Sequence, residues 1–330
     1  MIRMGVIGAG HLGRWHLQNI QKIPDAELVG FYDTDPAHSA LIAGETGAIS
    51  FSSLAQLLRT IDAASIVVPT VFHYETALAA IREGVHIFCE KPFMLTVGQA
   101  DEVIRRAREK KLIVQVGQIE RFNPALTALK NYPIRPLFIE SHRLSPFNPR
   151  GTDVSVILDL MIHDIDIALS LVDSPVRSIH AAGAPVLTDS IDVANARIQF
   201  ENGCVANLTA SRISDESVRK MQIFQDKTFI TVDFLNKFSE ICWQADDSGK
   251  NPPDTISVPI PDASGNILKT IFRRKITPEK SDALFDELSV FVSAIQNGTP
   301  PLVTGEDGRK ALDIALKIEQ EIQSTLRSFK

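Results

Sequence analysis

Three glycines close to the N-terminus constrain the fold more than any other feature of the chain. Gly8, Gly10 and Gly13 follow an apolar run at residues 2–7 and precede a helical pattern that continues to about residue 22. A glycine triplet alone is a weak signal, because it also occurs in ordinary turns. Here it joins a strand to a helix, and Asp33 stands 20 positions after Gly13 at the end of the next strand. This arrangement predicts a dinucleotide-binding βαβ unit.

Each part of this unit has a physical reason. The first glycine allows a tight turn, the second lets the backbone approach a pyrophosphate, and the third lets the helix pack closely. The first N–H groups of the helix face the phosphates. Asp33 would accept hydrogen bonds from the adenosine ribose and repel a 2′-phosphate, so NAD is favoured over NADP. A glycine turn that binds nothing is the alternative. The predicted cofactor contacts here are Gly8, Gly10, His11, Leu12, Gly13 and Asp33.

Strand and helix patterns alternate over the first 120 residues. Helical patterns separate the apolar runs, which we interpret as strands at 2–7, 26–32, 64–68, 85–89 and 112–116. Strands that alternate with helices of this length indicate βαβ units and a parallel, right-handed, doubly wound sheet. We therefore predict an α/β domain over residues 1–122.

The rhythm changes at residue 123, and the remaining residues are expected to form a second domain, 123–330. A strand at 137–143 and a helix at 154–172 precede a series of strands between 176 and about 258. Successive strands favour an antiparallel sheet. Helices are predicted at 282–297 and 306–326, and these could pack back on the first domain. The second domain is thus predicted to be α+β, with a large, mostly antiparallel open sheet covered on one face.

Composition narrows the class of protein. The net charge of −6 argues against a nucleic-acid or anionic-membrane partner. Cys89, Cys204 and Cys242 are odd in number and far apart, which predicts neither a zinc site nor a disulfide framework and suggests a reducing compartment. No signal-peptide pattern opens the chain, and no apolar run reaches the roughly 18 residues of a membrane span. We expect a cytoplasmic protein.

The tripeptide Glu90-Lys91-Pro92 follows the predicted strand at 85–89. Ligands of open α/β sheets bind outside the carboxyl ends of the strands. We therefore expect Glu90 and Lys91 to contact cofactor, and Lys91 also to contact substrate. The strand at 64–68 is followed by Pro69, Thr70 and His73. We expect these three residues to border the nicotinamide half of the cofactor, although an ordinary turn would explain them equally well.

A second set of polar residues lies on the helix predicted at 154–172. At about 100° per residue, Asp159, His163 and Asp166 share one face. One interpretation is a core histidine held by Asp159. Another is an acid/base pair in which the carboxylate raises the pKa of the histidine toward neutrality. A zinc site is less favoured, since no cysteine lies nearby and the other histidines are scattered.

The glycine loop, Glu90-Lys91-Pro92 and the Asp159-x-x-x-His163 spacing, taken in order, resemble the Gfo/Idh/MocA oxidoreductases, the glucose–fructose oxidoreductase and inositol dehydrogenase family. The resemblance extends to the segment at 305–312. It implies a Rossmann domain, then an α+β domain whose open sheet commonly forms the oligomer interface, so a homodimer or homotetramer is expected. It also implies that Lys91 and the aspartate–histidine pair border the substrate hydroxyl and the nicotinamide, and that the peptide bond before Pro92 is cis.

The implied reaction is hydride transfer between a secondary alcohol carbon and C4 of the nicotinamide. His163 is our choice of base and Asp159 its orienting partner, while Lys91 stabilises the developing alkoxide and relays the proton. The roles of the lysine and the histidine could be exchanged. The same three residues are expected to contact substrate.

Two further stretches, 117–124 and 158–166, resemble the branch that oxidises C3 of UDP-N-acetylglucosamine, whose 3-keto product an aminotransferase converts toward a 2,3-diamino sugar for lipid A. Guanidinium groups suit a diphosphate. Arg121 and Arg150 are the predicted substrate contacts, and Arg143 and Arg212 are further candidates. The alternatives are an inositol or other sugar dehydrogenase, a non-catalytic NAD-binding regulator, and a reductase of an imine or tetrapyrrole.

Overall fold

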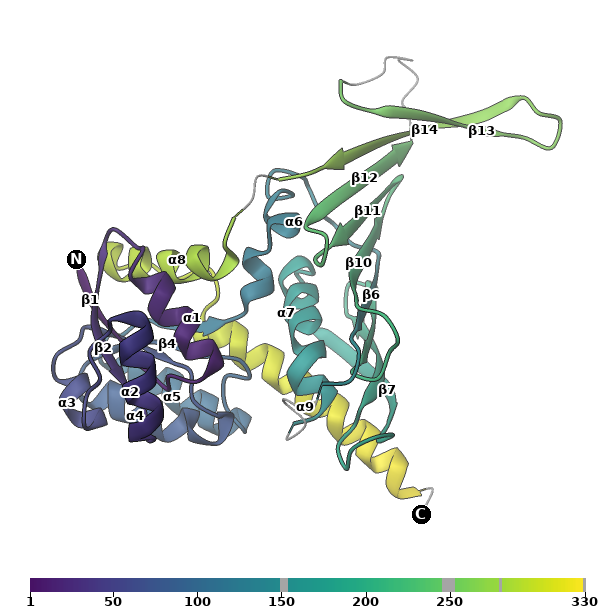
Figure 1. Cartoon of the computed structure of the whole chain (residues 1–330). Helices are drawn as coiled ribbons and strands as arrows, with labels where there is room; N and C mark the ends of the chain where they lie inside the picture. The colour runs from purple at the N-terminus through teal and green to yellow at the C-terminus, as the bar shows by residue number, and fades with distance from the viewer. Residues whose placement is uncertain (149–153, 245–252, 279–280, 329–330) are drawn as a thin grey trace. The chain divides into compact units, whose positions relative to one another are not determined.

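The computed structural model describes residues 1–148, 154–244, 253–278 and 281–328. The chain divides into two compact units (Figure 1). The first unit consists of Met1–Phe122 and Ser281–Asp313, and the second of Asn123–Lys280 and Ile314–Lys330. The second domain was predicted to span residues 123–330, with C-terminal helices that could pack back on the first domain. The structure groups Ser281–Asp313 with the first unit, in agreement with such packing.

The first unit contains the predicted parallel sheet. Its strands are β1 (Ile2–Ile7), β2 (Ala26–Tyr32), β3 (Ala63–Ile66), β4 (His86–Glu90) and β5 (Val114–Gly117), in the order β2-β1-β3-β4-β5. Every pair in it is parallel, which confirms the predicted fold class. The helices between the strands are α1 (His11–Ile20), α2 (Pro36–Thr46), α3 (Leu54–Leu58), α4 (His73–Arg82) and α5 (Val97–Glu109).

Helix α8 (Ala283–Asn297) completes the core of the first unit. Leu288 and Phe291 are fully buried, and the Phe291 ring meets the edge of Phe88 on β4 at 6.0 Å between centroids. The helix packs against α1, β1 and β4. The loop after it continues this association, because Val116 on β5 donates its N–H to the carbonyl of Val303. The sheet therefore obtains part of its cover from residues nearly 200 positions downstream.

The described part of the second unit contains a nine-stranded sheet in the order β13-β14-β12-β11-β10-β6-β9-β8-β7. Only the β6–β9 pair is parallel among its pairings, so the predicted, mostly antiparallel sheet is confirmed. Strands β13 and β14 extend from one edge as a hairpin (Figure 1). The strands are β6 (Phe138–Leu144), β7 (Val176–Ala184), β8 (Val193–Phe200), β9 (Val205–Ser211), β10 (Val218–Gln225), β11 (Thr228–Asp233), β12 (Phe238–Gln244), β13 (Ile256–Pro261) and β14 (Ile267–Ile276).

Helices cover one face of this sheet. Strand β8 alternates buried and more exposed residues, as a strand with a single covered face requires. Helix α7 (Ile162–Leu171) packs against β6 and β9. The chain closes with α9 (Gly305–Ser328), of which residues 305–313 belong to the first unit and the rest to the second. The short α6 (Pro124–Thr127) lies near β11 and β12.

The predicted helix at 154–172 is not uniformly α-helical. Residues Ile157–Met161 form a π-helical turn, in which the N–H of Ile162 reaches the carbonyl of Ile157, and α7 follows directly. A π-helical turn is wider than an α-helical one, and such turns are frequent at functional sites. Over this turn the rotation per residue is therefore smaller than the 100° used for the prediction.

A buried carboxylate fixes the turn before β8 and makes stability depend on pH. Asp192 accepts hydrogen bonds from the N–H groups of Val186, Leu187 and Thr188 at 2.7–2.9 Å. Burial acts to raise the pKa of Asp192, but these bonds and the Thr188 hydroxyl outweigh it and lower the pKa from 3.8 to about 2. A carboxyl whose folded pKa is depressed stabilises the fold above its unfolded pKa and loses this contribution as pH falls through the folded value.

We therefore expect Asp192→Asn to lower the free energy of unfolding by about 2 kcal/mol near neutral pH. The gap between the two proteins should narrow as pH falls from about 4 toward about 2, because wild type then loses its ionised carboxylate. Urea unfolding followed by circular dichroism across that pH range measures the gap. A gap that stays constant down to the lowest pH would contradict the role of the charge.

Candidate active site

The glycine loop has the geometry that a close approach to phosphate requires. Gly8 has φ of +90°, which residues with a Cβ rarely adopt. A Cβ at Gly13 would lie 2.0 Å from the carbonyl oxygen of Gly8, so only glycine lets α1 begin this close to β1. Around Gly10 there is open space, with no heavy atom of the described residues within 4 Å of the position of a Cβ. His11 and Leu12 follow, exposed, in the first turn of α1.

Asp33 stands at the end of β2 and fixes the loop. Its Oδ2 accepts the N–H of Ala9 at 2.7 Å, and its Oδ1 accepts the N–H of Asp35 at 3.0 Å. A carboxylate has about four acceptor positions, so two remain for ribose hydroxyls. Asp35 caps α2 by accepting the N–H groups of Ala37 and His38. The Asp33 carboxylate beside the loop disfavours a cofactor with a further phosphate on its ribose.

A hollow of about 530 Å³ lies between the carboxyl ends of β1 and β3. In the strand order of this sheet that is the switch point, where open α/β sheets bind ligands. The volume is within the usual range for small-molecule sites. The described residues that line it include no arginine or lysine. The adenosine half of NAD fits this combination of glycine backbone, acid and apolar wall; the lining includes Gly8, Gly10, Asp33, Val68, Pro69 and Phe72.

The predicted Glu90-Lys91-Pro92 site stands at the end of β4. Glu90 is the last residue of the strand, Lys91 follows it half-buried, and the Lys91–Pro92 bond is cis, as the resemblance implied. Glu90 accepts the N–H of Lys91 at 3.2 Å. Burial acts to raise the pKa of Glu90. A hydrogen bond from His16 and the charges of His16 and Lys91 outweigh this effect and lower the pKa below its usual value, so the carboxyl is ionised at neutral pH.

His16 was not predicted to belong to this site. It lies on α1 with 1% of its surface exposed. Its Nε2 is 3.2 Å from Oε1 of Glu90, and its Nδ1 is 2.8 Å from Oγ of Ser65 on β3. The available signal was its position three residues after Gly13, on the helix face that must pack against the sheet. A polar residue at a buried position needs a partner, and the sequence does not say which one.

His73, which we expected to contact the cofactor, is buried beside the end of β3. The ring is 1% exposed and lies between backbone carbonyls. Its Nδ1 is 3.0 Å from the oxygen of Pro92, and its Nε2 is 2.9 Å from that of Val68. Burial lowers the pKa of His73, although these carbonyls oppose the shift. His73 therefore ties the end of β3 to the segment after Lys91, while Pro69 lines the hollow and Thr70 lies half-buried beside it.

In the second unit, the predicted acid–histidine pair lies where the π-helical turn meets α7. Asp159 is in the turn and half-buried, and His163 is the second residue of α7 with 8% of its surface exposed. Asp166 is 1% exposed. Asp164, which follows His163, is also buried and forms a bidentate ion pair with Arg143. Nε of Arg143 donates to Oδ2 of Asp164 at 2.8 Å, and Nη2 donates to Oδ1 at 3.0 Å.

The candidate arginines for substrate binding differ in their surroundings. Arg143 is 2% exposed, and its guanidinium is paired with Asp164 on α7. This ion pair holds α7 against β6, so we do not assign Arg143 to phosphate binding. Arg212 is 4% exposed, and its Nη2 donates to the carbonyl of Val154 at 2.6 Å. Arg121 lies half-buried in the 3₁₀ turn Ile119–Phe122. Arg150 lies outside the described residues.

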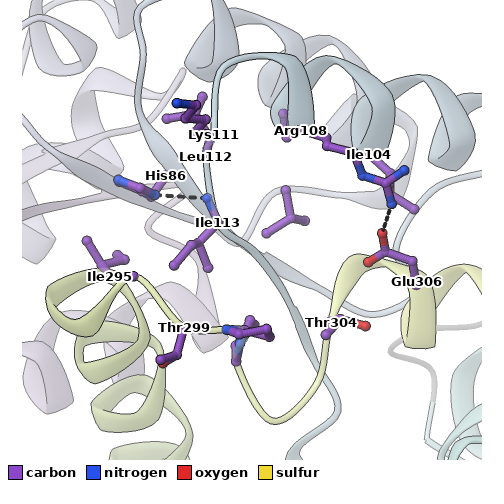
Figure 2. A pocket seen from close by; sticks show the side chains of 15 residues that line it. His86, Ile104, Arg108, Lys111, Leu112, Ile113, Ile295, Thr299, Thr304 and Glu306 are labelled. Carbon is purple, nitrogen blue, oxygen red and sulfur yellow. Dashed lines mark hydrogen bonds and ion pairs between the residues drawn. The ribbon is translucent and has the colours of Figure 1, made fainter.

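A second hollow, of about 600 Å³, lies at the opposite edge of the parallel sheet (Figure 2). His86 and Ile113 stand at the amino ends of β4 and β5, and the N–H of Ile113 donates to Nδ1 of His86 at 2.9 Å. Across the opening, Arg108 pairs with Glu306 at 2.6 Å. Because ligands of such sheets bind at the carboxyl ends, this hollow is not the expected cofactor site.

Two classes of feature were searched for over the described residues. No group of three or more histidine, cysteine or acidic side chains there could hold a metal ion. None of the described helices is long and apolar enough to cross a membrane.

Comparison with known proteins identifies the family. Residues 2–118 match the model of the oxidoreductase family with an NAD-binding Rossmann fold, and residues 135–231 match the GFO/IDH/MocA C-terminal domain. The chain is 36% identical over 327 residues to a UDP-N-acetylglucosamine 3-dehydrogenase of Acidithiobacillus ferrooxidans, with 99% of each chain covered. It is 24% identical over 341 residues to a myo-inositol 2-dehydrogenase of Thermotoga maritima, covering 98% of this chain and 96% of the relative.

A solved structure of the Acidithiobacillus ferrooxidans enzyme superposes with a TM-score of 0.88 at 35% identity, covering 98% of each chain. The likeness therefore extends over nearly the whole chain, including residues of both units. With its NAD-binding domain and a relative of this identity along nearly its full length, the chain belongs to the Gfo/Idh/MocA family of oxidoreductases.

Proposed function

We propose that the protein oxidises the C3 hydroxyl of UDP-N-acetylglucosamine to a ketone, with NAD as the hydride acceptor. The observation that carries this proposal is the 36% identity to the UDP-N-acetylglucosamine 3-dehydrogenase over 99% of both chains. The inositol dehydrogenase relative is similar over a comparable length at only 24% identity. A 3-keto sugar nucleotide is a substrate for transamination, which would lead toward the diamino sugar of lipid A.

The chemistry divides between the two units. Bound NAD would accept the hydride at C4 of its nicotinamide. Lys91 follows the strand end beside the dinucleotide hollow, and its ammonium would stabilise the alkoxide that develops when the substrate hydroxyl loses its proton. Electrostatic stabilisation of developing charge by a fixed donor is a large contribution to catalysis. Glu90 supplies a neighbouring ionised carboxylate that is itself held by hydrogen bonds.

His163 is the proposed base and Asp159 its orienting partner. A histidine can accept a proton near neutral pH, and a carboxylate on the same helix can hold its ring in one tautomer. The firm attachment of Asp164 to Arg143 supports the proposal, because it fixes the start of α7 directly beside His163. Lys91 and His163 could exchange the roles of stabiliser and base. Arg121 and Arg150 are the proposed contacts for the diphosphate.

The assembly proposed is a homodimer or homotetramer through the open sheet of the second unit. Among the described residues, the helices that pack on this sheet lie on one face, and we propose that the other face receives the second copy.

The substrate assignment predicts which compound reduces NAD. With purified protein, UDP-N-acetylglucosamine should increase the absorbance of NADH, while myo-inositol, scyllo-inositol and N-acetylglucosamine alone should support at most about 1% of that kcat/KM, because none offers a diphosphate to bind. Turnover with an inositol at higher kcat/KM would move the protein to the alternative branch. Silence with every substrate, despite NAD binding, would favour a non-catalytic regulator.

Removing the proposed catalytic side chains should lower turnover without loss of cofactor binding. Lys91→Ala and His163→Ala are each expected to lower kcat by about 10²–10⁴-fold, the usual contribution of a positioned acid or base. Lys130→Ala, at an exposed position, and His86→Gln, at the far end of β4, are matched controls that should retain near-normal kcat. Isothermal titration with NAD checks binding, and near-normal turnover in both catalytic variants would overturn the assignment.

Asp33 should determine the choice between NAD and NADP. Repulsion between its carboxylate and a 2′-phosphate is expected to favour NAD by roughly 10²-fold in kcat/KM. Asp33→Ser should narrow this ratio by raising the use of NADP. Asp35→Ser is the control, since a serine can still cap α2. Equal use of both cofactors by wild type would show that Asp33 does not face the ribose.

A further inference from the structure

A chain of three buried side chains lies beneath the strand end that carries Lys91. Ser65 on β3 and His16 on α1 are 0% and 1% exposed, and the side chain of Glu90 is 15% exposed. Oγ of Ser65 is 2.8 Å from Nδ1 of His16, whose Nε2 is 3.2 Å from Oε1 of Glu90. The imidazole also meets the ring of Phe88 edge-on at 5.5 Å between centroids. The histidine is thus held from three sides.

The chemistry of the groups fixes the direction of the hydrogen bond to Glu90. An ionised carboxylate can only accept, so Nε2 of His16 must carry the hydrogen. In the neutral ring Nδ1 then accepts from the hydroxyl of Ser65, and in the imidazolium it donates to the same oxygen. Ser65 can serve in either state because a hydroxyl both donates and accepts. The arrangement therefore delivers an N–H to Glu90 in both protonation states of the histidine.

The neighbouring strand leaves room for the carboxylate in this position. Glu90 pairs with Gly117 in the register of β4 and β5. A Cβ on Gly117 would lie 3.0 Å from the carboxyl carbon and from Oε1 of Glu90, which is tighter than ordinary contact. The carboxylate is confined between α1 on one side and the backbone of β5 on the other. Its second oxygen accepts the N–H of Lys91.

We propose that His16 is a positioning residue for Lys91: by donating from Nε2 it holds the carboxylate of Glu90 against the Lys91 backbone and fixes a negative charge beside the lysine side chain. His16 does not act on the substrate. It lies on the helix that begins at the glycine loop, so it also connects the phosphate-binding segment to the proposed catalytic lysine. The effect on turnover rests on the proposed function, whereas the effect on Glu90 does not.

The charge state of Glu90 follows from the titratable groups around it. His16 faces it from α1, Lys91 follows it in the chain, and Cys89 precedes it. His73 on α4 lies near enough to be influenced by its charge. Burial alone would raise the pKa of Glu90, and the hydrogen bond and charge of His16 are foremost among the influences that lower it. Loss of the histidine should therefore raise the pKa of Glu90.

Two substitutions separate the hydrogen bond from the bulk of the side chain. His16→Leu removes the donor and keeps an apolar side chain of similar size. His16→Gln keeps an amide N–H that can reach the position of Nε2. His86→Gln, at the amino end of the same strand, is the matched control. Thermal melting shows whether each variant keeps its fold. The NAD dissociation constant shows whether the glycine loop is intact, and we expect it to stay within about threefold of wild type.

The first measurement needs no substrate. In protein labelled with ¹³C at the glutamate carboxyl carbons, the Glu90 signal is identified by its loss in Glu90→Gln. Titration of that signal should show a higher pKa for Glu90 in His16→Leu than in wild type. Much of this rise should be absent in His16→Gln, and His86→Gln should titrate like wild type. An unchanged titration in His16→Leu would overturn the inference, whatever the substrate proves to be.

The second measurement is turnover with UDP-N-acetylglucosamine. For His16→Leu we expect kcat to fall by about 10²-fold with little change in the KM for NAD, the loss typical of a misplaced catalytic group. The acid limb of the pH profile of kcat should move upward with the pKa of Glu90, and His16→Gln should recover most of the activity. A normal kcat and pH profile beside a shifted Glu90 titration would overturn the positioning role. A shifted titration with no turnover in wild type would count against the proposed function instead.

Discussion

The parallel alignment of three strands is the constraint on which the site of the first unit depends. Strands β1, β3 and β4 pair in register, so that Ile7 lies opposite Ile66 and Ile66 opposite Cys89. Because the strands run in the same direction, the segments that follow them emerge at one edge of the sheet. The glycine loop, the wall of the nucleotide hollow and the Lys91 segment are far apart in sequence and meet there. The hollow between β1 and β3 and the side-chain chain from α1 to β4 are both consequences of this alignment.

Much of the fold could be predicted, because local patterns agree with the final arrangement. The alternating strands and helices of the first 120 residues specify a parallel sheet, and the later succession of strands specifies an antiparallel one. The placement of α8 could not be predicted in the same way. An apolar helix face shows that a helix is buried, and it does not identify the sheet that buries it; Phe291 finds Phe88 only in the folded chain. The π-helical turn at Ile157–Met161 was also missed, since its residues fit an α-helical pattern equally well.

The site was predictable in its motifs and not in its supporting contacts. Residue types and spacing singled out Asp33 and Lys91, which stand where the sequence placed them. His16 was missed because its partners are 49 and 74 positions away, and no local pattern encodes such pairs. Arg143 was considered as a phosphate contact because a guanidinium suits phosphate and carboxylate alike. Only the structure shows that it is buried against Asp164. The His73 ring could likewise bind a ligand, but both of its nitrogens lie within hydrogen-bond distance of backbone carbonyls.

The same device supports both elements that carry the proposed catalytic groups. Glu90 directly precedes Lys91, and Asp164 directly follows His163. Each is a largely buried carboxylate, held by His16 and a backbone N–H in one case and by Arg143 in the other. Burying a charge is unfavourable unless it is well paired, so such pairs add little net stability and are weak grounds for explaining the fold. Their value lies in restricting the position of the neighbouring residue, since catalysis loses heavily when a reacting group is displaced by about 1 Å. In each unit, a paired acid thus stands one residue from the proposed catalytic side chain and restricts the position of its backbone.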